Sequence, residues 1–429
     1  MFHERPAADV PAVDVAVDCL AAGIEAARPA RAVERHCGLE GETLRIRDAE
    51  YDLSRFESVR ILGGGKAADG LAAALERLLG NRVDGVVVTD ERTADPDAVT
   101  VHEGEHPTPG EGSVAGTAAV LERAEAASEE TLVLAAVTGG GSALLCAPAA
   151  GLAAADVATV TEGLLAAGAP IGAINTVRRA CSAVKGGGLA ATAAPATVVG
   201  VLVSDVVGDD PAVVASGPTV PQATDPAVAL SVLDEYGVEA PAVREWLADA
   251  SPEPAPDVDA DVHVVASGRD AVEAAREAAA DRGYTPCPLS TRIEGEAGEA
   301  GRFHAAVAGE VAASGSPVDP PAVLLSGGET TVTVDGNGIG GPNLEFVVGA
   351  GIDLPASAVV GAVDTDGSDG GTDAAGAVCG PIDDAAAARA ALSNDDSLPF
   401  LEDRGALLRS GPTSTNINDL RVVVVGKRF

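Results

Sequence analysis

The sequence predicts an α/β fold, because three features recur in the same order along most of the chain. An apolar run typical of a β-strand is followed by a glycine-rich turn, and then by an alanine-rich stretch with helical spacing. Runs that are apolar throughout are typical of strands buried on both faces of a parallel sheet. The clearest examples are Val59–Leu62, Leu132–Val137, Val198–Val203 and Val323–Leu325.

A chain of 429 residues is long enough for two or three domains. The segment Ser251–Asp257 is rich in proline and acid, has no periodicity, and precedes a new apolar run at Val262–Ala266. We therefore expect domains at 1–255 and 262–429, with the proline-rich Ser316–Pro321 as the alternative boundary.

The composition excludes several classes of protein. Lys and Arg number 28 against 65 Asp and Glu, which gives a formal charge of −37. So acidic a surface repels nucleic acid and anionic lipid. The N-terminus lacks the apolar stretch of a signal peptide, and no apolar run is long enough to span a membrane, so we expect a cytoplasmic protein. The charge also resembles that of halophilic proteins, in which salt screens self-repulsion.

Two of the three lysines in the chain lie beside triple glycines. Lys66 follows Gly63–Gly65 and Lys185 precedes Gly186–Gly188. An ammonium group suits a phosphate or carboxylate oxygen, and glycines let backbone N–H groups approach the same anion. Thr138–Ser142 follows an apolar run and offers a similar anion site, as do Ser326–Thr330 and Ser410–Thr413. Ordinary turns or helix caps are the alternative interpretation for each.

Acidic loops follow two further strands. Ser204–Asp210 comes after Val198–Val203, and Asp364–Asp373 comes after Val359–Val363. In open α/β sheets ligands bind at the carboxyl ends of strands, where a carboxylate can orient a hydroxyl or hold Mg²⁺. Solvated acidic turns are the alternative. Thr413–Asp419 adds hydroxyl and amide donors before the last strand.

Two motifs carry other interpretations. Gly336–Gly341 matches the GxGxxG pattern of dinucleotide-binding proteins, between an expected strand at Thr330–Val334 and an expected helix at Asn343–Ala350. Its Asp335–Gly336 start is equally typical of a hairpin. His102–His106 matches HExxH, but Gly104 and the following prolines predict a loop in place of a zinc-binding helix.

Taken together, these motifs resemble the class II glycerate kinases, the family with a MOFRL C-terminal domain that was often named hydroxypyruvate reductase. The resemblance runs in one order from residue 63 to about residue 420. It also includes the His106–Pro109 turn, Asn175–Arg179, Ser182–Gly187, Ala215–Thr219 and Asn343–Phe346.

The resemblance implies a doubly wound, Rossmann-like N-terminal domain, a smaller α/β C-terminal domain and a cleft between them. It implies phosphorylation of D-glycerate to 2-phosphoglycerate with ATP and Mg²⁺, by a monomer or a homodimer. Lys66 would neutralise developing charge and Asp205 would orient or deprotonate the hydroxyl. Asp205, Asp209 and Asp366 are the expected metal ligands. The other expected substrate- or nucleotide-binding residues are Gly64, Gly65, Gly140, Gly141, Ser142, Asn175, Arg178, Lys185, Ser216, Gly327, Glu329, Asn343, Glu345, Asp366, Thr413 and Asn416.

One position departs from the family pattern, which commonly has arginine where this chain has Pro342. If that arginine held the substrate carboxylate or a phosphate, Arg178, Arg179 or Lys185 would have to replace it. Two other functions stay open at this point: a hydroxypyruvate reductase that uses the 336–341 loop, and a non-catalytic protein that binds a sugar acid.

Overall fold

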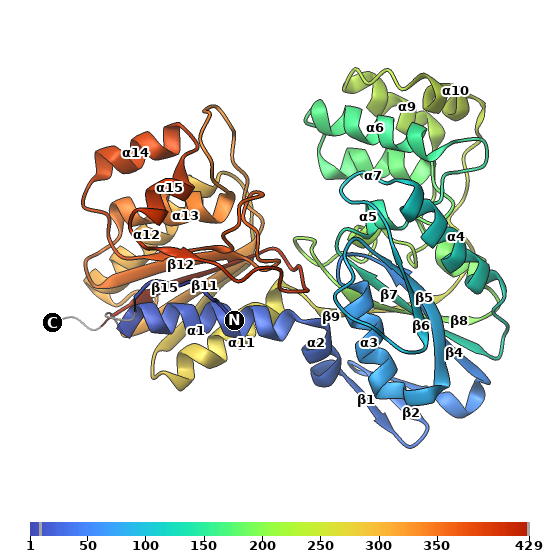
Figure 1. Ribbon diagram of the computed structural model, residues 1–429, viewed down its shortest axis with the longest axis horizontal. Coiled ribbons are helices and arrows are strands. Elements are labelled where there is room, and N and C mark those ends of the chain that lie inside the picture. Colours follow the sequence, from blue (N-terminus) through green and yellow to red (C-terminus); the bar gives the residue numbers. More distant parts are fainter. Residues whose placement is uncertain (8–10, 427–429) are drawn as a thin grey trace. The chain divides into compact units, whose positions relative to one another are not determined.

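The computed structural model describes residues 1–7 and 11–426 and divides into two compact units. The middle unit is Pro29–Val265, and the terminal unit combines Met1–Arg28 with Ala266–Phe429. Figure 1 labels most of the elements of both. Each unit contains a six-stranded sheet with helices packed against it. The predicted α/β class is therefore confirmed for both.

The middle unit has the strand order of a Rossmann fold. Its sheet is ordered β6-β5-β4-β7-β8-β9, and the pairs β4–β5, β5–β6, β4–β7 and β7–β8 are parallel. The chain moves outward from β4 in one direction and from β7 in the other, so the strand order reverses between them. The strands are β4 Ser58–Gly64, β5 Val83–Thr89, β6 Val99–Glu103, β7 Thr131–Thr138, β8 Thr197–Val203 and β9 Ala260–Ala266.

Helices cover this sheet and form a separate cluster beyond it. The core around β4, β7 and β8 includes Leu62, Val133, Val137 and Leu202. The sheet is accompanied by α2 Pro29–His36, α3 Ala68–Leu79, α4 Glu111–Glu125, α5 Gly141–Leu144 and α8 Gly188–Ala193, and by a small antiparallel sheet of β1 Cys37–Glu40, β2 Thr43–Ile46 and β3 Ala49–Asp52. Figure 1 shows four more helices grouped beside α5: α6 Ala154–Ala166, α7 Ile171–Ala180, α9 Pro226–Glu235 and α10 Pro241–Asp249. These four share their own apolar core.

The terminal unit has a mixed sheet ordered β10-β11-β15-β12-β13-β14. β15 runs antiparallel to both β11 and β12. The start of β15 therefore lies at the same edge as the carboxyl ends of β11 and β12. The elements are α1 Pro11–Ala27, α11 Gly268–Asp281, β10 Thr285–Ile293, α12 Ala297–Ser314, β11 Ala322–Gly328, α13 Pro342–Asp353, β12 Ala358–Asp364, β13 Gly376–Cys379, α14 Ala385–Ser393, α15 Ser397–Glu402, β14 Leu407–Leu408 and β15 Asp419–Val425.

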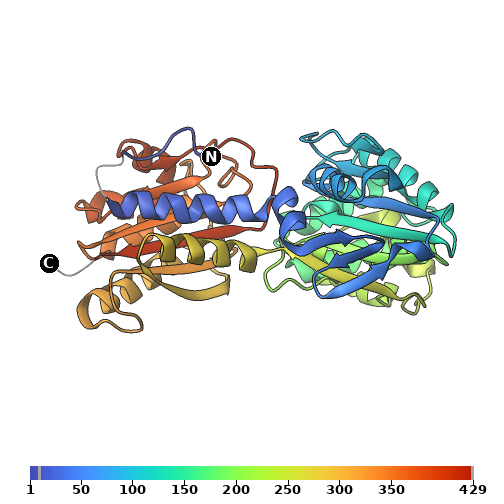
Figure 2. The ribbon, with the colours of Figure 1, turned by 90° about the horizontal axis from the view of Figure 1, so that it is seen from below.

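The first helix changes the expected domain organisation. α1 lies beside α11 and against β15, as Figure 2 shows. Their approach is so close that a Cβ on Gly23 would come within 2.3 Å of Leu420 Cδ2. Residues 1–28 thus pack with the C-terminal part of the chain, whereas we expected them in a domain spanning 1–255.

The boundary expected between residues 255 and 262 also differs from the one in the structure. β9 was expected to open a C-terminal domain at 262–429, but it joins the middle sheet beside β8. Arg47 Nε and Tyr51 Oη, both from the middle unit, donate hydrogen bonds to Val264 O and Asp261 Oδ2. The division therefore falls after Val265, and the proline-rich segment that suggested an earlier boundary is a loop within the middle unit.

Candidate active site

In the middle unit, β4 and β7 carry two loops at the point where the strand order of the six-stranded sheet reverses. Lys66, directly after β4, donates its backbone N–H to Gly139 O at 2.8 Å, and Ala67 N donates to Thr138 Oγ1 at 3.1 Å. Gly65 has φ +140°, and a Cβ there would lie 2.2 Å from Thr138 Oγ1. Only glycine allows this contact. The predicted glycine loops Gly64–Lys66 and Gly139–Ser142 are thus joined into one structure.

Asp205, at the carboxyl end of β8, lies against the second loop. A Cβ on Gly139 would lie 2.3 Å from Asp205 Oδ2, so the carboxylate occupies the space that this glycine leaves. Burial raises the pKa of Asp205, while the Gly140 N–H and the charge of Lys66 oppose that rise. Lys66 and Asp205 therefore face the same loop with opposite charges. The Gly140 N–H, which we expected to bind an anion, is directed at Asp205.

His106 lies beside the same loop, although it was not among the site residues predicted from the sequence. A Cβ on Gly140, which has φ +76°, would lie 2.9 Å from Lys66 Cγ and 3.3 Å from His106 Nε2. The imidazole and the lysine stem therefore both cover Gly140. The His-Pro-Thr-Pro turn was part of the family resemblance, and its first residue is the one that reaches the site.

A chain of hydroxyl groups leads from α5 to α7. Ser216 Oγ donates to Asn175 Oδ1 at 3.0 Å and lies 2.8 Å from Ser142 Oγ. Because the Ser216 proton is used by Asn175, Ser142 is the donor to Ser216. Ser216 has φ +63° and the preceding Ala215 has φ +50°, a conformation that costs energy in residues with a side chain and is often found at functional sites. The expected residues Ser142, Asn175 and Ser216 are thus brought together.

Lys185 is buried, and its ammonium group contacts the backbone of α5. Its Nζ donates to Ser142 O at 2.8 Å and to Leu145 O at 3.0 Å. Burial lowers the pKa of Lys185 to about 7. Two of its three donors are therefore used on backbone carbonyls. Arg178 lines a small cavity with Ser142, Cys146 and Lys185.

The remaining predicted residues lie in the terminal unit, around a buried ion pair. Arg421 is fully buried and pairs with Asp419, and its Nη2 donates to Thr330 Oγ1 at 2.9 Å. Asn343 Nδ2 donates to Asp419 Oδ1 at 2.7 Å and to Asp369 Oδ1 at 3.1 Å. The sequence pointed to Asn343, but a buried arginine inside an apolar last strand gave no signal.

Two loops of the terminal unit are tied together at the same sheet edge. Thr413 N donates to Asp366 O at 3.1 Å, and Thr365 Oγ1 donates to Asn418 O at 2.7 Å. Asn416 Oδ1 accepts from Asn418 N within its own turn, and Glu329 is exposed. Burial, followed by nearby acids, raises the pKa of Glu345 to about 7. Gly327 is the next-to-last residue of β11, and a Cβ there would lie 3.2 Å from Asp419 O. The predicted residues thus form two groups, one in each unit.

The GxGxxG segment does not have the structure of a dinucleotide site. Residues 331–341 contain no strand where one was expected at Thr330–Val334. The N-terminus of α13 is occupied by Asp369, whose carboxylate accepts from Asn343 N at 2.9 Å and from Leu344 N at 2.8 Å. A pyrophosphate needs those N–H groups and would meet a carboxylate there. Pro342 is the first residue of α13, a position where proline's fixed φ is favourable and its missing N–H is not needed.

The predicted metal ligands do not form a complete metal centre. Within residues 1–7 and 11–426, no group of three or more His, Cys, Asp or Glu side chains could hold an ion. Asp205 and Asp209 lie in one loop of the middle unit, and Asp366 lies in the terminal unit. One or two carboxylates are enough for Mg²⁺ when substrate phosphates supply other ligands.

Comparison with known proteins decides the family. A domain of unknown function, DUF4147, matches residues 15–248, and the MOFRL family matches residues 322–419. A D-glycerate 2-kinase of Thermotoga maritima is 36% identical over 426 residues, covering 96% of this chain and 98% of that protein. This chain belongs to the MOFRL-containing glycerate kinase family.

Other relatives agree in structure and differ in name. The crystal structure of a Thermotoga maritima glycerate kinase is 34% identical, with a TM-score of 0.83, and covers 96% of this chain and 99% of its own. A protein of Agrobacterium vitis, provisionally named a hydroxypyruvate reductase, is 40% identical over 384 residues, covering 85% of this chain and 99% of that protein. Asp369 occupies the N-terminus of α13, and this weighs against a nicotinamide-dependent reductase that uses the GxGxxG segment.

Proposed function

We propose that this protein transfers the γ-phosphoryl group of ATP to the 2-hydroxyl of D-glycerate and so forms 2-phosphoglycerate. The observation that carries the proposal is the opposition of Lys66 and Asp205 across Gly139 and Gly140, where the strand order of the middle sheet reverses. Ligands of open α/β sheets bind at such a position. The kinase names of the family members agree with it.

In the proposed reaction Asp205 accepts the proton of the attacking hydroxyl. The hydroxyl oxygen forms a bond to the γ-phosphorus, while the bond from that phosphorus to the bridging oxygen of ADP breaks. A carboxylate with a raised pKa is a better proton acceptor than an exposed one, and Asp205 is in that condition. Lys66 stabilises the charge that develops on the transferred oxygens.

Mg²⁺ would neutralise phosphate charge when it is bound with ATP. Asp205 and Asp209 are the carboxylates of the middle unit that would hold it. The donor chemistry fits, since Mg²⁺ prefers carboxylate oxygens and keeps several waters or phosphate oxygens as its other ligands.

Arg178 is our choice for holding the substrate carboxylate. Of the three cations that could replace the family arginine, Lys185 already donates to two backbone carbonyls. Arg178 lines the small cavity that Ser142 also lines, next to the catalytic loops. Its planar guanidinium can hold a carboxylate with two parallel hydrogen bonds.

The test measures ADP release from MgATP with D-glycerate in molar KCl, beside a parallel assay of hydroxypyruvate with NADH or NADPH. Glycerate-dependent ADP together with 2-phosphoglycerate, identified by NMR, supports the proposal. Nicotinamide oxidation without ADP release would replace it with the reductase. The salt is included because we also propose that a charge of −37 requires molar salt for folding, and full helical circular dichroism in dilute buffer would refute that part.

No helix in the part of the chain that the structure describes has the length and hydrophobicity needed to cross a bilayer. A cytoplasmic location, and assembly as a monomer or a homodimer, remain parts of the proposal.

A further inference from the structure

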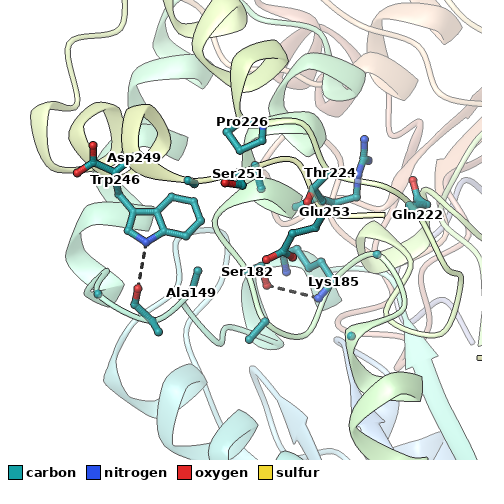
Figure 3. Close-up of a pocket in the computed structure, with 18 of the residues that line it drawn as sticks. Ala149, Ser182, Lys185, Gln222, Thr224, Pro226, Trp246, Asp249, Ser251 and Glu253 are labelled. Atoms are coloured by element: carbon teal, nitrogen blue, oxygen red, sulfur yellow. Dashed lines mark hydrogen bonds between the residues drawn. The ribbon is translucent and has the colours of Figure 1, made fainter. Parts of the chain in front are cut away.

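One cavity of the middle unit is lined by neither Lys66 nor Asp205. Its volume is about 790 Å³, within the range of pockets that bind small molecules. Residues from four segments, 149–151, 179–188, 222–226 and 249–256, form its walls, together with one side of α10. In Figure 3, Trp246 and Asp249 lie on one side of the cavity, and Gln222 and Thr224 lie on the other.

Hydrogen bonds hold these walls in place. Trp246 Nε1 donates to Ala150 O at 3.0 Å, which fixes the indole ring at the edge of the cavity. The backbones of Thr224 and Glu253 pair in both directions, at 3.0 and 2.9 Å, and Gln222 N donates to Gly186 O at 3.1 Å. The cavity is therefore formed before a ligand arrives, which lowers the ordering cost of binding.

The lining has opposite charges in different places. Arg179 and Lys185 are the cations, and both are at least partly buried. Glu245, Asp249 and Glu253 are exposed carboxylates at the rim. Figure 3 shows Glu253 directed toward the turn that carries Ser182 and Lys185. A ligand that is anionic throughout would be repelled by the rim, and an uncharged ligand would not use the cations.

A nucleoside phosphate matches each of these parts. Trp246 supplies an aromatic face or edge for a base, and carboxylates are suitable acceptors for ribose hydroxyl groups. Arg179 and Lys185 supply positive charge for phosphate oxygens, and Lys185 keeps one donor beyond the two that it spends on carbonyls.

The cavity shares two lining residues with the small cavity beside Ser142. Ser182 and Lys185 line both this cavity and the small cavity shared with Ser142 and Arg178. We propose that the 790 Å³ cavity binds the nucleoside part of the phosphoryl donor, with its phosphates beside Arg179 and Lys185. This inference rests on the proposed function, because it places the ATP of that reaction.

Trp246 allows a direct test, because it is the only tryptophan in the chain. Its fluorescence is measured while ATP, ADP, adenosine, tripolyphosphate or D-glycerate is added in molar KCl. We expect a saturable change with ATP and ADP, a weaker one with adenosine, and none with D-glycerate. A response to tripolyphosphate equal to that of ATP would overturn the nucleoside assignment.

Kinetics of variants provide the second readout. Glu253→Gln is expected to raise KM for ATP about tenfold and to leave KM for D-glycerate unchanged. Trp246→Phe is also expected to raise KM for ATP, and because it removes the tryptophan, its binding is followed by kinetics alone. Glu239→Gln, an exposed acid that does not line the cavity, is the matched control and should change neither KM.

The two proposals fail in different ways. An active glycerate kinase with an ordinary KM for ATP in both cavity variants, and without a fluorescence response, overturns the cavity assignment and leaves the proposed function intact. A protein that shows the nucleotide response but phosphorylates no glycerate overturns the proposed function and supports the cavity as a nucleotide site.

Discussion

Gly139→Ala tests the geometry of the catalytic carboxylate without removing a catalytic side chain. The new methyl carbon would lie 2.3 Å from Asp205 Oδ2, about 1 Å less than the 3.4 Å at which ordinary contact begins. Gly139 is not among the residues with positive φ, so alanine can adopt its backbone conformation. The carboxylate must therefore move by about 1 Å. A displacement of this size at a reacting group costs about 10²-fold in rate, or about 2.7 kcal/mol of transition-state stabilisation.

The assay is glycerate-dependent ADP release at saturating MgATP, with thermal unfolding measured on the same samples. We expect kcat to fall about 10²-fold while the fold is kept, because the displaced group is a side chain. Gly172→Ala in α7 is the matched control, since a Cβ there meets nothing within 4 Å. It should keep full activity and gain up to about 1 kcal/mol in stability. Wild-type turnover by Gly139→Ala would refute the placement of Asp205 at the reacting hydroxyl.

Three further predictions follow from single residues. Lys66→Ala should lower kcat at least 10²-fold, with the fold kept by circular dichroism, and unchanged turnover would reject its role. Arg421→Met leaves Asp419 buried without its cation and should cost about 3–5 kcal/mol in chemical unfolding, whereas the exposed Arg302→Met should cost under about 1 kcal/mol. Burial lowers the pKa of His304 to about 4. As pH falls from about 6.5 toward 4, this histidine therefore binds a proton in the unfolded chain but not in the native state. Stability should therefore drop by about 3 kcal/mol between pH 6.5 and 4 through this residue. His304→Gln should reduce that drop, and exposed His3→Gln should not.

Strand positions could be predicted because burial on two faces leaves a clear apolar run. β4, β7, β8 and β11 all contain the runs that the sequence indicated. Chain order did not show which sheet each element joins. α1 is an apolar helix that any sheet could accept, and it packs in the terminal unit through contacts made possible by Gly23. The sheet that β9 joins could not be predicted either, because an apolar run specifies a strand but not the neighbouring strand with which it pairs.

The candidate site was predicted where backbone conformation requires glycine. Gly65 and Gly140 have positive φ and approach other atoms so closely that a side chain would collide, which is why triple glycines mark the loops. His106 and Arg421 escaped prediction, because a lone histidine in a loop and an arginine in a strand have many uses. The Gly336–Gly341 motif did not predict a dinucleotide site for a related reason: Gly336 and Gly338 pack against the backbone of Asn394 and Asp395, and Gly341 packs against Asp369.

The use of lysine at 185, in a chain with only two other lysines, follows from the number of donors. Lys185 has three N–H groups and a buried pair of carbonyl acceptors, so at most one donor is left for a ligand. An arginine there would bring five N–H groups into the same enclosed space, and each one left without an acceptor would cost roughly 1–3 kcal/mol. Burial also lowers the pKa of Lys185 to about 7, which arginine's far higher pKa would not allow. A phosphate beside this amine would favour its charged form, so the site would hold its proton most firmly when the nucleotide is bound.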